Sequence, residues 1–422
     1  MTTRREARDL SQMTILFLTK SFPIYGGVER FIADLASGLR DRGHSCRVGL
    51  ANGRNFHNAR NYARAYPELD WFALESQTGS PIGRRMAIAK ALITQRPDIV
   101  VPLRLADGLH VATKLKSLLS YKLVYSAHEA CDGVARDIGL YGRYLDRVVV
   151  RDQTTRRLAE DVLADSRKIR LISHGVPIGR AIERGPADKL RIGFCGRLQH
   201  AGKRIGDLVE LVARLERNKL AYSLTIAGDG PDRARLENEL GAAAKTGEVE
   251  FLGARDRAFL YEAFYPAIDI ALITSAWETG PLVAFEAMMH QCVVVCADYR
   301  GRQENEFLEH DRNCLVYPVG DIEQLLICLQ RLRQEPSLVA RLGGQARRDA
   351  VRARGLERMI DEWEVVVREV QGLQSGTSVR FVADSLASVV SQSPQVAKEI
   401  ARKMLRRAFL HRSAGEEWPS HC

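Results

Sequence analysis

The feature that most constrains the fold is the alternation of short apolar runs with amphipathic stretches along the chain. Residues 14–19 are apolar enough for a strand buried on both faces, and residues 28–42 carry Phe31, Leu35 and Leu39 on one helical face. The same succession recurs to about residue 370. Strands that alternate with helices predict a parallel sheet covered by helices on both faces. We therefore expect an α/β fold.

The apolar runs and the helical periods place the remaining elements. Further strands are predicted at residues 46–51, 98–103, 122–126, 147–151, 168–172, 222–227, 249–252, 269–274, 291–298 and 314–318. Residues 190–198 are predicted to form a strand and the turn after it. Helices are predicted at residues 83–95, 108–120, 154–164, 205–218, 232–246, 282–290 and 356–370. A chain of 422 residues is long enough for two domains with full cores.

Composition narrows the class of protein. A net charge of +10 suits an anionic ligand, an anionic membrane surface or nucleic acid. No helix-turn-helix, zinc finger or aromatic-basic platform stands out, so nucleic acid is not an expected partner. The eight cysteines form no Cys-x-x-Cys pair, which indicates a reducing compartment and no zinc site. The polar first residues and the lack of a long apolar run predict a cytoplasmic protein with no membrane span.

The most informative stretch lies at residues 269–290. A strand is followed by a loop, and Pro281 fits the first turn of the next helix, where its missing N–H costs nothing. The amides of residues 280–283 suit an anion or a hydroxyl-rich ligand. Glu278 in the loop and Glu286 on the helix add two carboxylates. Ligands of open α/β sheets bind at the carboxyl ends of the strands, so this stretch predicts a polyol-and-phosphate site.

The spacing Glu278-x7-Glu286, followed by Ala287-Met288, resembles the donor-site signature of GT-B glycosyltransferases, the retaining family 4 group. The resemblance implies that Glu278 contacts the transferred sugar and that Glu286 holds the ribose of the nucleotide. Gly280 departs from the family pattern, which usually has an aromatic or aliphatic residue there. This departure bears on sugar selectivity.

Three further motifs resemble the same family. Gly196-Arg197-Leu198 with Lys203 matches an element whose cations neutralise the donor diphosphate, and a guanidinium fork and an ammonium are suitable phosphate donors. Gly228 lies in an Ala-Gly-Asp-Gly-Pro run that flanks the nucleotide in the family. Gly26 and Gly27 resemble the glycine loop whose amides face the donor phosphates.

His128 comes two residues after the strand at residues 122–126, at its carboxyl end, and is followed by Glu129. Many family members have a His at a similar place, so the resemblance implies a polar contact to the transferred sugar. The expected catalytic groups are Glu278, His128, Arg197 and Lys203. The expected substrate-binding residues are Gly26, Gly27, Gly196, Arg197, Lys203, Gly228, Gly280, Pro281, Leu282 and Glu286.

The resemblance implies a GT-B architecture of two Rossmann-like domains that face each other across a cleft. Residues 1–182 would form the acceptor domain and residues 183–355 the nucleotide-sugar donor domain. Residues 356–372 would be the helix that crosses back to the first domain, and residues 373–422 a basic amphipathic tail. In that tail, residues 394–412 carry six Lys or Arg and one Glu beside an apolar stripe. The stretch fits a solvated helix or a helix on an anionic membrane surface.

The expected activity is retaining transfer of a sugar from a nucleotide-sugar to an acceptor hydroxyl. A lipid-linked glycan of lipopolysaccharide, capsule or exopolysaccharide synthesis is the expected acceptor. No Asp-x-Asp occurs, so no metal cofactor is expected. Two alternatives remain open: a non-catalytic binding protein that keeps the GT-B fold, and a GT-B enzyme that acts on a small soluble acceptor. The base, the sugar and the linkage are not determined by the sequence.

Overall fold

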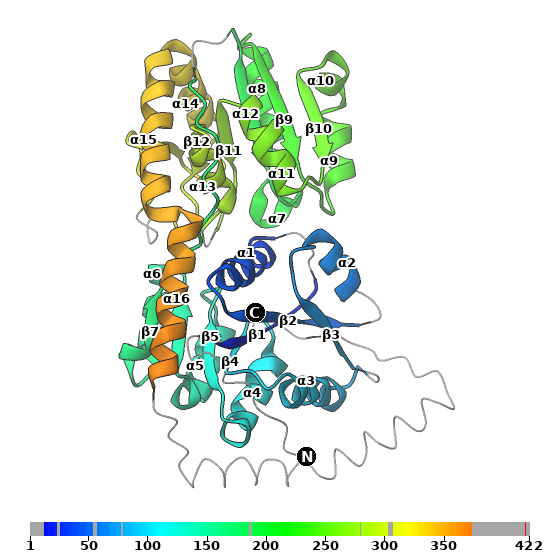
Figure 1. Cartoon of the computed structure of the whole chain (residues 1–422). Helices are drawn as coiled ribbons and strands as arrows, with labels where there is room; N and C mark the ends of the chain where they lie inside the picture. The colour runs from blue at the N-terminus through cyan, green and yellow to red at the C-terminus, as the bar shows by residue number, and fades with distance from the viewer. Residues whose placement is uncertain are drawn as a thin grey trace, which may run out of the picture. The chain divides into compact units, whose positions relative to one another are not determined.

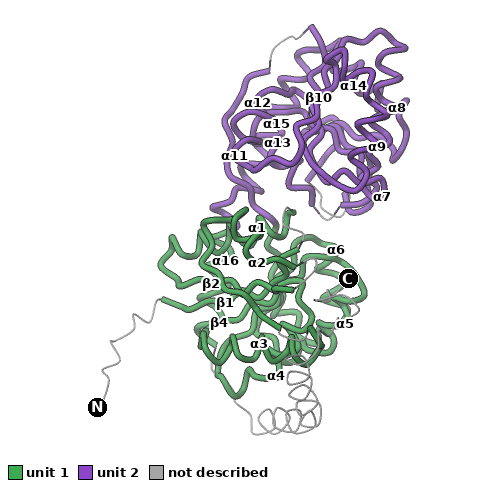
Figure 2. Tube along the Cα trace, turned by 90° about the vertical axis from the view of Figure 1, so that its right-hand side faces the viewer, with its two compact units in different colours: residues 1–173, 360–422 green, residues 174–359 purple. Residues whose placement is uncertain are grey.

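The computed structural model describes residues 12–22, 26–53, 57–76, 79–184, 188–278, 280–302, 307–373 and 418. The chain forms two compact units, residues 1–173 with 360–422 and residues 174–359 (Figure 2). The second unit thus begins at His174 rather than at residue 183, and it ends at Met359 rather than at residue 355. Hydrogen bonds from Val176 N to Arg354 O (2.8 Å) and from Leu356 N to Val176 O (2.9 Å) tie the start of this unit to its end.

Unit 1 is built on a seven-stranded, all-parallel sheet in the order β3-β2-β1-β4-β5-β6-β7 (Figure 1). Its strands are β1 (Thr14–Thr19), β2 (Ser45–Asn52), β3 (Trp71–Glu75), β4 (Ile99–Pro102), β5 (Lys122–Ser126), β6 (Arg147–Val150) and β7 (Ile169–Leu171). Its helices are α1 (Gly27–Asp41), α2 (Ala59–Ala65), α3 (Pro81–Gln95), α4 (Ala106–Leu119), α5 (Asp132–Tyr141), η1 (Gly142–Tyr144), α6 (Gln153–Val162) and η2 (Ser166–Lys168).

Unit 2 is built on a six-stranded, all-parallel sheet in the order β10-β9-β8-β11-β12-β13. Its strands are β8 (Leu190–Cys195), β9 (Tyr222–Ala227), β10 (Val249–Gly253), β11 (Ile270–Ile273), β12 (Val293–Ala297) and β13 (Cys314–Tyr317). Its helices are α7 (His200–Lys203), α8 (Gly206–Arg217), α9 (Arg233–Glu239), α10 (Gly241–Thr246), α11 (Arg257–Phe259), η3 (Leu260–Phe264), α12 (Tyr265–Ala267), α13 (Leu282–Met289), α14 (Ile322–Gln334) and α15 (Pro336–Arg354).

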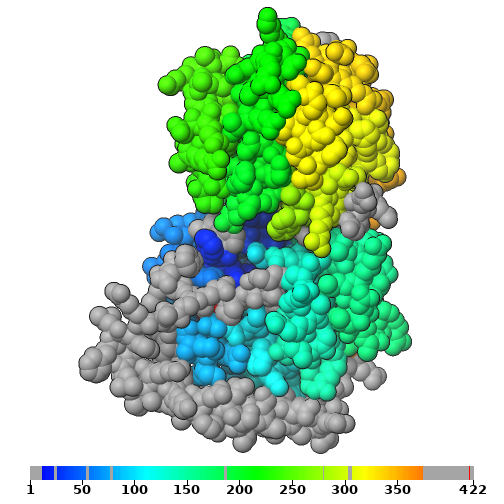
Figure 3. Space-filling view, turned by 180° about the vertical axis from the view of Figure 1, so that it is seen from behind, coloured from blue at the N-terminus to red at the C-terminus, as the bar shows by residue number. Residues whose placement is uncertain are grey.

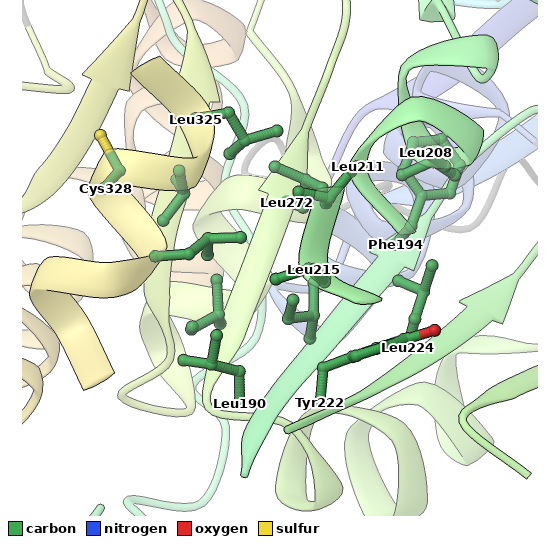
Figure 4. Packing of buried hydrophobic residues seen from close by; sticks show 14 of the residues in the cluster. Leu190, Phe194, Leu208, Leu211, Leu215, Tyr222, Leu224, Leu272, Leu325 and Cys328 are labelled. Atoms are coloured by element: carbon green, nitrogen blue, oxygen red, sulfur yellow. The ribbon is translucent and has the colours of Figure 1, made fainter. Parts of the chain in front are cut away.

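Both faces of the second sheet are covered by apolar side chains. On one face, leucines of α8 and α14 pack on β8, β9 and β11, as Figure 4 shows for Leu208, Leu211 and Leu325. Figure 3 shows α8 in green and α14 in yellow lying side by side on this flank of unit 2. On the other face, the buried residues of α13 pack against β11 and β12. Burying one such leucine contributes about 1.5–3 kcal/mol, so the sheet is fixed between two apolar layers.

The helix α16 (Leu356–Gly372) starts in unit 2 and continues into unit 1 from Ile360 onward. In unit 1 the Trp363 ring packs against Phe31 of α1, with ring centroids 6.0 Å apart. Ile360 fills the space beside Gly38, where an added Cβ would come within 2.2 Å of Ile360 Cδ1. Glu364 reaches His44 Nε2 at 2.6 Å. The described part of the expected crossing helix is therefore an integral layer of the first sheet.

The expected fold class, an α/β protein with two Rossmann-like domains, is confirmed. The expected helix at residues 232–246 is wrong in one respect, because it breaks into α9 and α10 at Leu240. The strand β3 and the helices α2, α5, α14 and α15 were not predicted. The expected tail helix at residues 394–412 lies outside the described residues.

Six cysteines, Cys46 and Cys195 among them, are free thiols, and five of the six are buried. Cys131 forms a disulfide, which the spacing of the cysteines did not predict. None of the helices in the described part of the chain combines the length and apolar character that crossing a membrane requires.

Candidate active site

The centre of the candidate site is an ion pair at the carboxyl edge of the second sheet. Glu278 follows β11, and Lys203 ends α7, which follows β8. The Lys203 ammonium contacts Glu278 Oε1, and the Ser275 hydroxyl donates to the same oxygen at 2.6 Å. Thr274 Oγ1 in turn donates to the Lys203 carbonyl at 2.6 Å. The structure thus joins two residues that the sequence assigned to different parts of the substrate.

The helix α13 starts at Leu282, but Pro281 lies outside its first turn. Pro281 is its N-cap residue, with extended backbone at φ −69° and ψ 108°, and the helix starts at Leu282. The expectation that Pro281 occupies the first turn is therefore wrong. Its carbonyl accepts the first helical bond, from Ala284 N at 3.0 Å. The amides of Leu282 and Val283 lie in the first turn, where no acceptor within the helix is available, so they suit an anionic or hydroxyl ligand.

Glu286 lies further along α13 and is only 6% exposed. The Tyr265 hydroxyl donates to Glu286 Oε2 at 2.7 Å, and the His290 ring stacks on the Tyr265 ring at 5.0 Å. Burial, followed by the charge of Glu286, raises the pKa of Tyr265 well above its ordinary value. The same two causes raise the pKa of the Cys195 thiol to about 12. Glu286 is therefore a buried carboxylate with a fixed orientation.

Tyr265 is a residue that the sequence analysis missed. It belongs to α12, next to the π-helical turn η3, and neither element carries a motif. Its apolar neighbours in sequence make it indistinguishable from an ordinary core tyrosine. The only signal is its hydroxyl, because a buried tyrosine hydroxyl needs a hydrogen-bond partner.

Two of the expected glycines have a structural reason. Gly228 has φ +144°, and a Cβ at this position would lie 1.9 Å from the Gly196 carbonyl oxygen. Gly228 N donates to Gly253 O at 2.8 Å and Gly196 N donates to Ala227 O at 3.0 Å, so both amides are used within the protein. These glycines bring the loops after β8 and β9 together. Their expected contact to the nucleotide stays a prediction.

The remaining expected residues of unit 2 are accessible. Arg197 is exposed, and its guanidinium makes no ion pair in the part of the chain that the structure describes. Gly280 has φ +120°, and an added Cβ would meet nothing within 4 Å. An exposed guanidinium that makes no ion pair within the described residues is compatible with a diphosphate, and an open backbone position is compatible with a sugar.

In unit 1, Gly26 caps α1 and Gly27 is its first residue, and both are exposed. Gly26 O accepts from Arg30 N at 3.1 Å. The helix start has no side-chain cap. Its position after β1 places it at the carboxyl edge of the first sheet, as the glycine-loop resemblance implies.

His128 is 3% exposed at the carboxyl edge of the same sheet. Its Nδ1 accepts from Arg151 Nη1 at 2.8 Å, so its Nε2 carries the proton, which faces Ser126 Oγ at 2.9 Å. Burial, then the charges of Arg151 and Arg104, hold the pKa of His128 well below its ordinary value. The ring is neutral and both its nitrogens are engaged, so in this conformation it is an oriented core residue. Its contact to the sugar stays a prediction.

A charged cluster beside His128 was not predicted. Arg104 follows β4 in the left-handed region, at φ 48°, and its Nη1 donates to Glu29 Oε1 at 3.2 Å. Its Nε lies 3.1 Å from Glu129 Oε1. Burial raises the pKa of the Glu29 carboxyl against the opposing charge of Arg104. Only Glu129 was noticed in the sequence, because a strained arginine has no sequence signature.

Within the described residues, no group of three or more His, Cys, Asp or Glu is placed to hold a metal ion. Glu306, which also resembles a family residue, lies outside the described residues.

Comparison with known families agrees with this geometry. A sequence model described as "Glycosyl transferases group 1" matches residues 189–335, and one described as "Glycosyltransferase Family 4" matches residues 25–180. Together the two matches span most of both units. The chain therefore belongs to the group 1 and family 4 glycosyltransferases. The expected enzyme class, a nucleotide-sugar-dependent glycosyltransferase, is confirmed.

Two curated relatives align over nearly their whole length. The lipopolysaccharide core biosynthesis glycosyltransferase LpsD of Rhizobium meliloti is 24% identical over 360 residues, 81% of this chain and 94% of that protein. The GDP-mannose-dependent alpha-mannosyltransferase of Mycobacterium tuberculosis is 26% identical over 391 residues, 85% of this chain and 95% of that protein.

Solved structures support the same fold. Anabaena Alr3699/HepE in complex with UDP has a TM-score of 0.69 at 20% identity, covering 85% of this chain and 100% of that one. The lipopolysaccharide outer core galactosyltransferase WaaB has a TM-score of 0.62 at 17% identity, covering 85% of this chain and 99% of that one. At these identities the likeness establishes the fold alone.

Gly228 and Gly241, both in unit 2, give a matched pair of substitutions. Gly228→Ala should destabilise unit 2 by at least about 1–3 kcal/mol, because the added Cβ collides with a backbone oxygen and the φ value is strained. Gly241→Ala has nothing within 4 Å and lies at the start of α10, so it should be neutral or stabilising by up to about 1 kcal/mol. Urea unfolding of both variants checks this. Equal midpoints would contradict the close approach of the two loops.

Proposed function

We propose that the chain transfers a sugar from a nucleotide-sugar to an acceptor hydroxyl and that the anomeric configuration is retained. The observation that carries this proposal is the gathering of Lys203, Glu278 and the start of α13 at one edge of the second sheet. A cation, free amides and an oriented carboxylate supply donors for a diphosphate and an acceptor for sugar hydroxyls.

Each residue has one role in this proposal. Lys203 and Arg197 stabilise the negative charge that develops on the leaving diphosphate. Glu278 binds hydroxyls of the transferred sugar from the position in which its contacts with Lys203 and Ser275 hold it. Glu286 accepts from the ribose hydroxyls in the orientation that Tyr265 fixes.

No step requires a nucleophile of the protein. The residues around Glu278 stabilise and position the donor, and the acceptor hydroxyl attacks on the side from which the diphosphate leaves. The bond from the anomeric carbon to the diphosphate oxygen breaks, the bond to the acceptor oxygen forms, and the acceptor proton passes to the leaving group. His128 contributes a neutral polar contact to the sugar.

The acceptor that we propose is a lipid-linked glycan in bacterial polysaccharide synthesis. LpsD acts in lipopolysaccharide core biosynthesis, and a 112-residue segment is 30% identical to the putative glycosyltransferase EpsF of Bacillus subtilis. The net charge of +10 and the basic stretch at residues 394–412 suit an anionic membrane surface. We propose peripheral attachment to the cytoplasmic face of the membrane.

The donor base remains open within the proposal. One similar structure is a complex with UDP, whereas the mycobacterial relative is GDP-mannose-dependent. We further propose that the reaction needs no metal ion, because the sequence has no Asp-x-Asp and Arg197 and Lys203 supply the positive charge.

The role of Glu286 can be separated from its structural contact. Glu286→Ala should weaken nucleotide-sugar binding about 10- to 100-fold, since the ribose loses a charge-assisted acceptor. Tyr265→Phe removes the internal hydrogen bond but keeps the carboxylate, so it should lower stability more than affinity. Calorimetry with UDP-glucose and GDP-mannose measures both. Unchanged affinity in a folded Glu286→Ala variant would refute the ribose contact.

The metal-independent mechanism predicts the behaviour of the two cations. Arg197→Ala and Lys203→Ala should each lower turnover about 100- to 1,000-fold, because each removes charge where the leaving group forms. Arg217→Ala, at the far end of α8, is the matched control and should leave turnover unchanged. Release of nucleoside diphosphate should persist in EDTA. Complete loss in EDTA with recovery in magnesium would exclude the proposed mechanism.

A further inference from the structure

Trp277, the residue before Glu278, is 60% exposed. Among the exposed large hydrophobic side chains of the described residues, Phe22 is the only other aromatic, and it is 43% exposed. Tryptophan has the largest apolar side chain, and an indole left in water beside a polar site is typical of a ligand-binding surface. The expected site residues do not explain this side chain.

The exposure of Trp277 is not the result of a loose loop. Ala276 N donates to Gly202 O at 2.8 Å, and Arg300 N donates to Ala276 O at 2.9 Å. Glu278 N donates to Arg300 O at 3.2 Å, which completes a parallel bridge between Trp277 and Arg300. The backbone on both sides of the indole is therefore held by two other segments of unit 2.

The indole itself lies against the turn that carries Lys203. A Cβ added at Gly202 would be 3.2 Å from Trp277 Nε1, and Gly202 has φ +80°. Glycine therefore allows the indole to rest on the backbone directly before Lys203, whose ammonium pairs with Glu278. The ring thus lies against the residue before Lys203 and is 60% exposed.

The backbone position at Gly280 is also open. Gly280 follows two residues after Glu278, and a Cβ at this position would meet nothing within 4 Å. A chain that binds a sugar through Glu278 has room for it here. The apolar face of a pyranose ring, formed by its C–H groups, matches the face of an indole.

We propose that Trp277 stacks on the transferred sugar of the nucleotide-sugar and contributes to the choice of donor. This inference rests on the proposed function, because it needs a nucleotide-sugar at Glu278. Trp277 is a further donor-binding residue, in addition to the two glutamates and the two cations assigned above. The diphosphate and the ribose are held by other residues, so the effect of Trp277 should be confined to the sugar.

Because only the contact to the sugar should depend on Trp277, ligands with and without the sugar can be compared. Trp277→Ala should lower affinity for the nucleotide-sugar about 3- to 10-fold and leave affinity for the matching nucleoside diphosphate within twofold. Trp277→Phe should recover most of the loss. Calorimetry compares UDP-glucose, UDP-galactose and GDP-mannose with UDP and GDP. Because the side chain is exposed and its backbone is held by main-chain bonds, both variants should fold.

Fluorescence gives an independent measurement. The chain has four tryptophans, of which Trp363 and Trp418 are buried and Trp71 is half-buried, so acrylamide quenches Trp277 most readily. The nucleotide-sugar that binds should protect this fluorescence from acrylamide, and the nucleoside diphosphate alone should not. Trp71→Phe is the matched control and should keep the protection, whereas Trp277→Phe should lose it.

The outcomes are distinguishable. If a nucleotide-sugar binds without protecting Trp277, or if Trp277→Ala weakens nucleotide and nucleotide-sugar equally, the stacking role is wrong and the proposed function stands. If the wild-type chain binds none of these nucleotides or nucleotide-sugars, the proposed function fails, and the role of Trp277 fails with it.

Discussion

The candidate site depends on backbone hydrogen bonds that hold the loops at the carboxyl edge of the second sheet. Leu198 N donates to Asp229 O at 2.9 Å, and Ala276 N donates to Gly202 O at 2.8 Å. Because main-chain hydrogen bonds fix these loops, the side chains of Lys203 and Glu278 are not needed to hold the loops together. They are left available to bind charge and hydroxyl groups, and substitutions there should affect ligands more than stability.

The candidate site residues of the two units differ in their electrostatic setting. In unit 2 Lys203 and Glu278 form an ion pair at the edge of the sheet, with side chains 33% and 14% exposed. In unit 1 His128 is buried and neutral, and the nearby Glu29 carboxyl has a raised pKa. A neutral histidine can donate or accept a hydrogen bond without attracting a counter-charge. The two cations to which the proposed reaction assigns the leaving diphosphate, Arg197 and Lys203, both belong to unit 2.

The sequence predicted the parts of the fold that depend on local pattern. Strands β1, β5 and β9 were predicted with the bounds that the structure has, because apolar runs between turn residues are strong local signals. The strand β3 was missed because the five-residue run Trp71–Glu75 is short and lies at the sheet edge, where only one of its residues is buried.

The local motifs of the candidate site could likewise be predicted from the sequence. The spacing of Glu278 and Glu286 and the Gly-Arg-Leu turn can be read along the chain. Other features of the site depend on contacts between separate segments of the chain. Lys203 pairs with Glu278, and the Tyr265 hydroxyl donates to Glu286. Arg104 adopts a left-handed backbone conformation. Such features arise from tertiary packing, so no local sequence pattern predicts them. Pro281 was expected in the first turn of α13, whereas its ψ of 108° makes it the N-cap residue.

The central claim is that a nucleotide-sugar binds at the carboxyl edge of the second sheet. Hydrogen–deuterium exchange of the full chain, with and without UDP-glucose or GDP-mannose, tests this most directly. We predict that the bound donor slows exchange in peptides that contain Lys203 and in peptides from residues 274–290, including the amides at the start of α13. Donor binding that leaves both regions unprotected, with protection confined to other segments, would contradict the account.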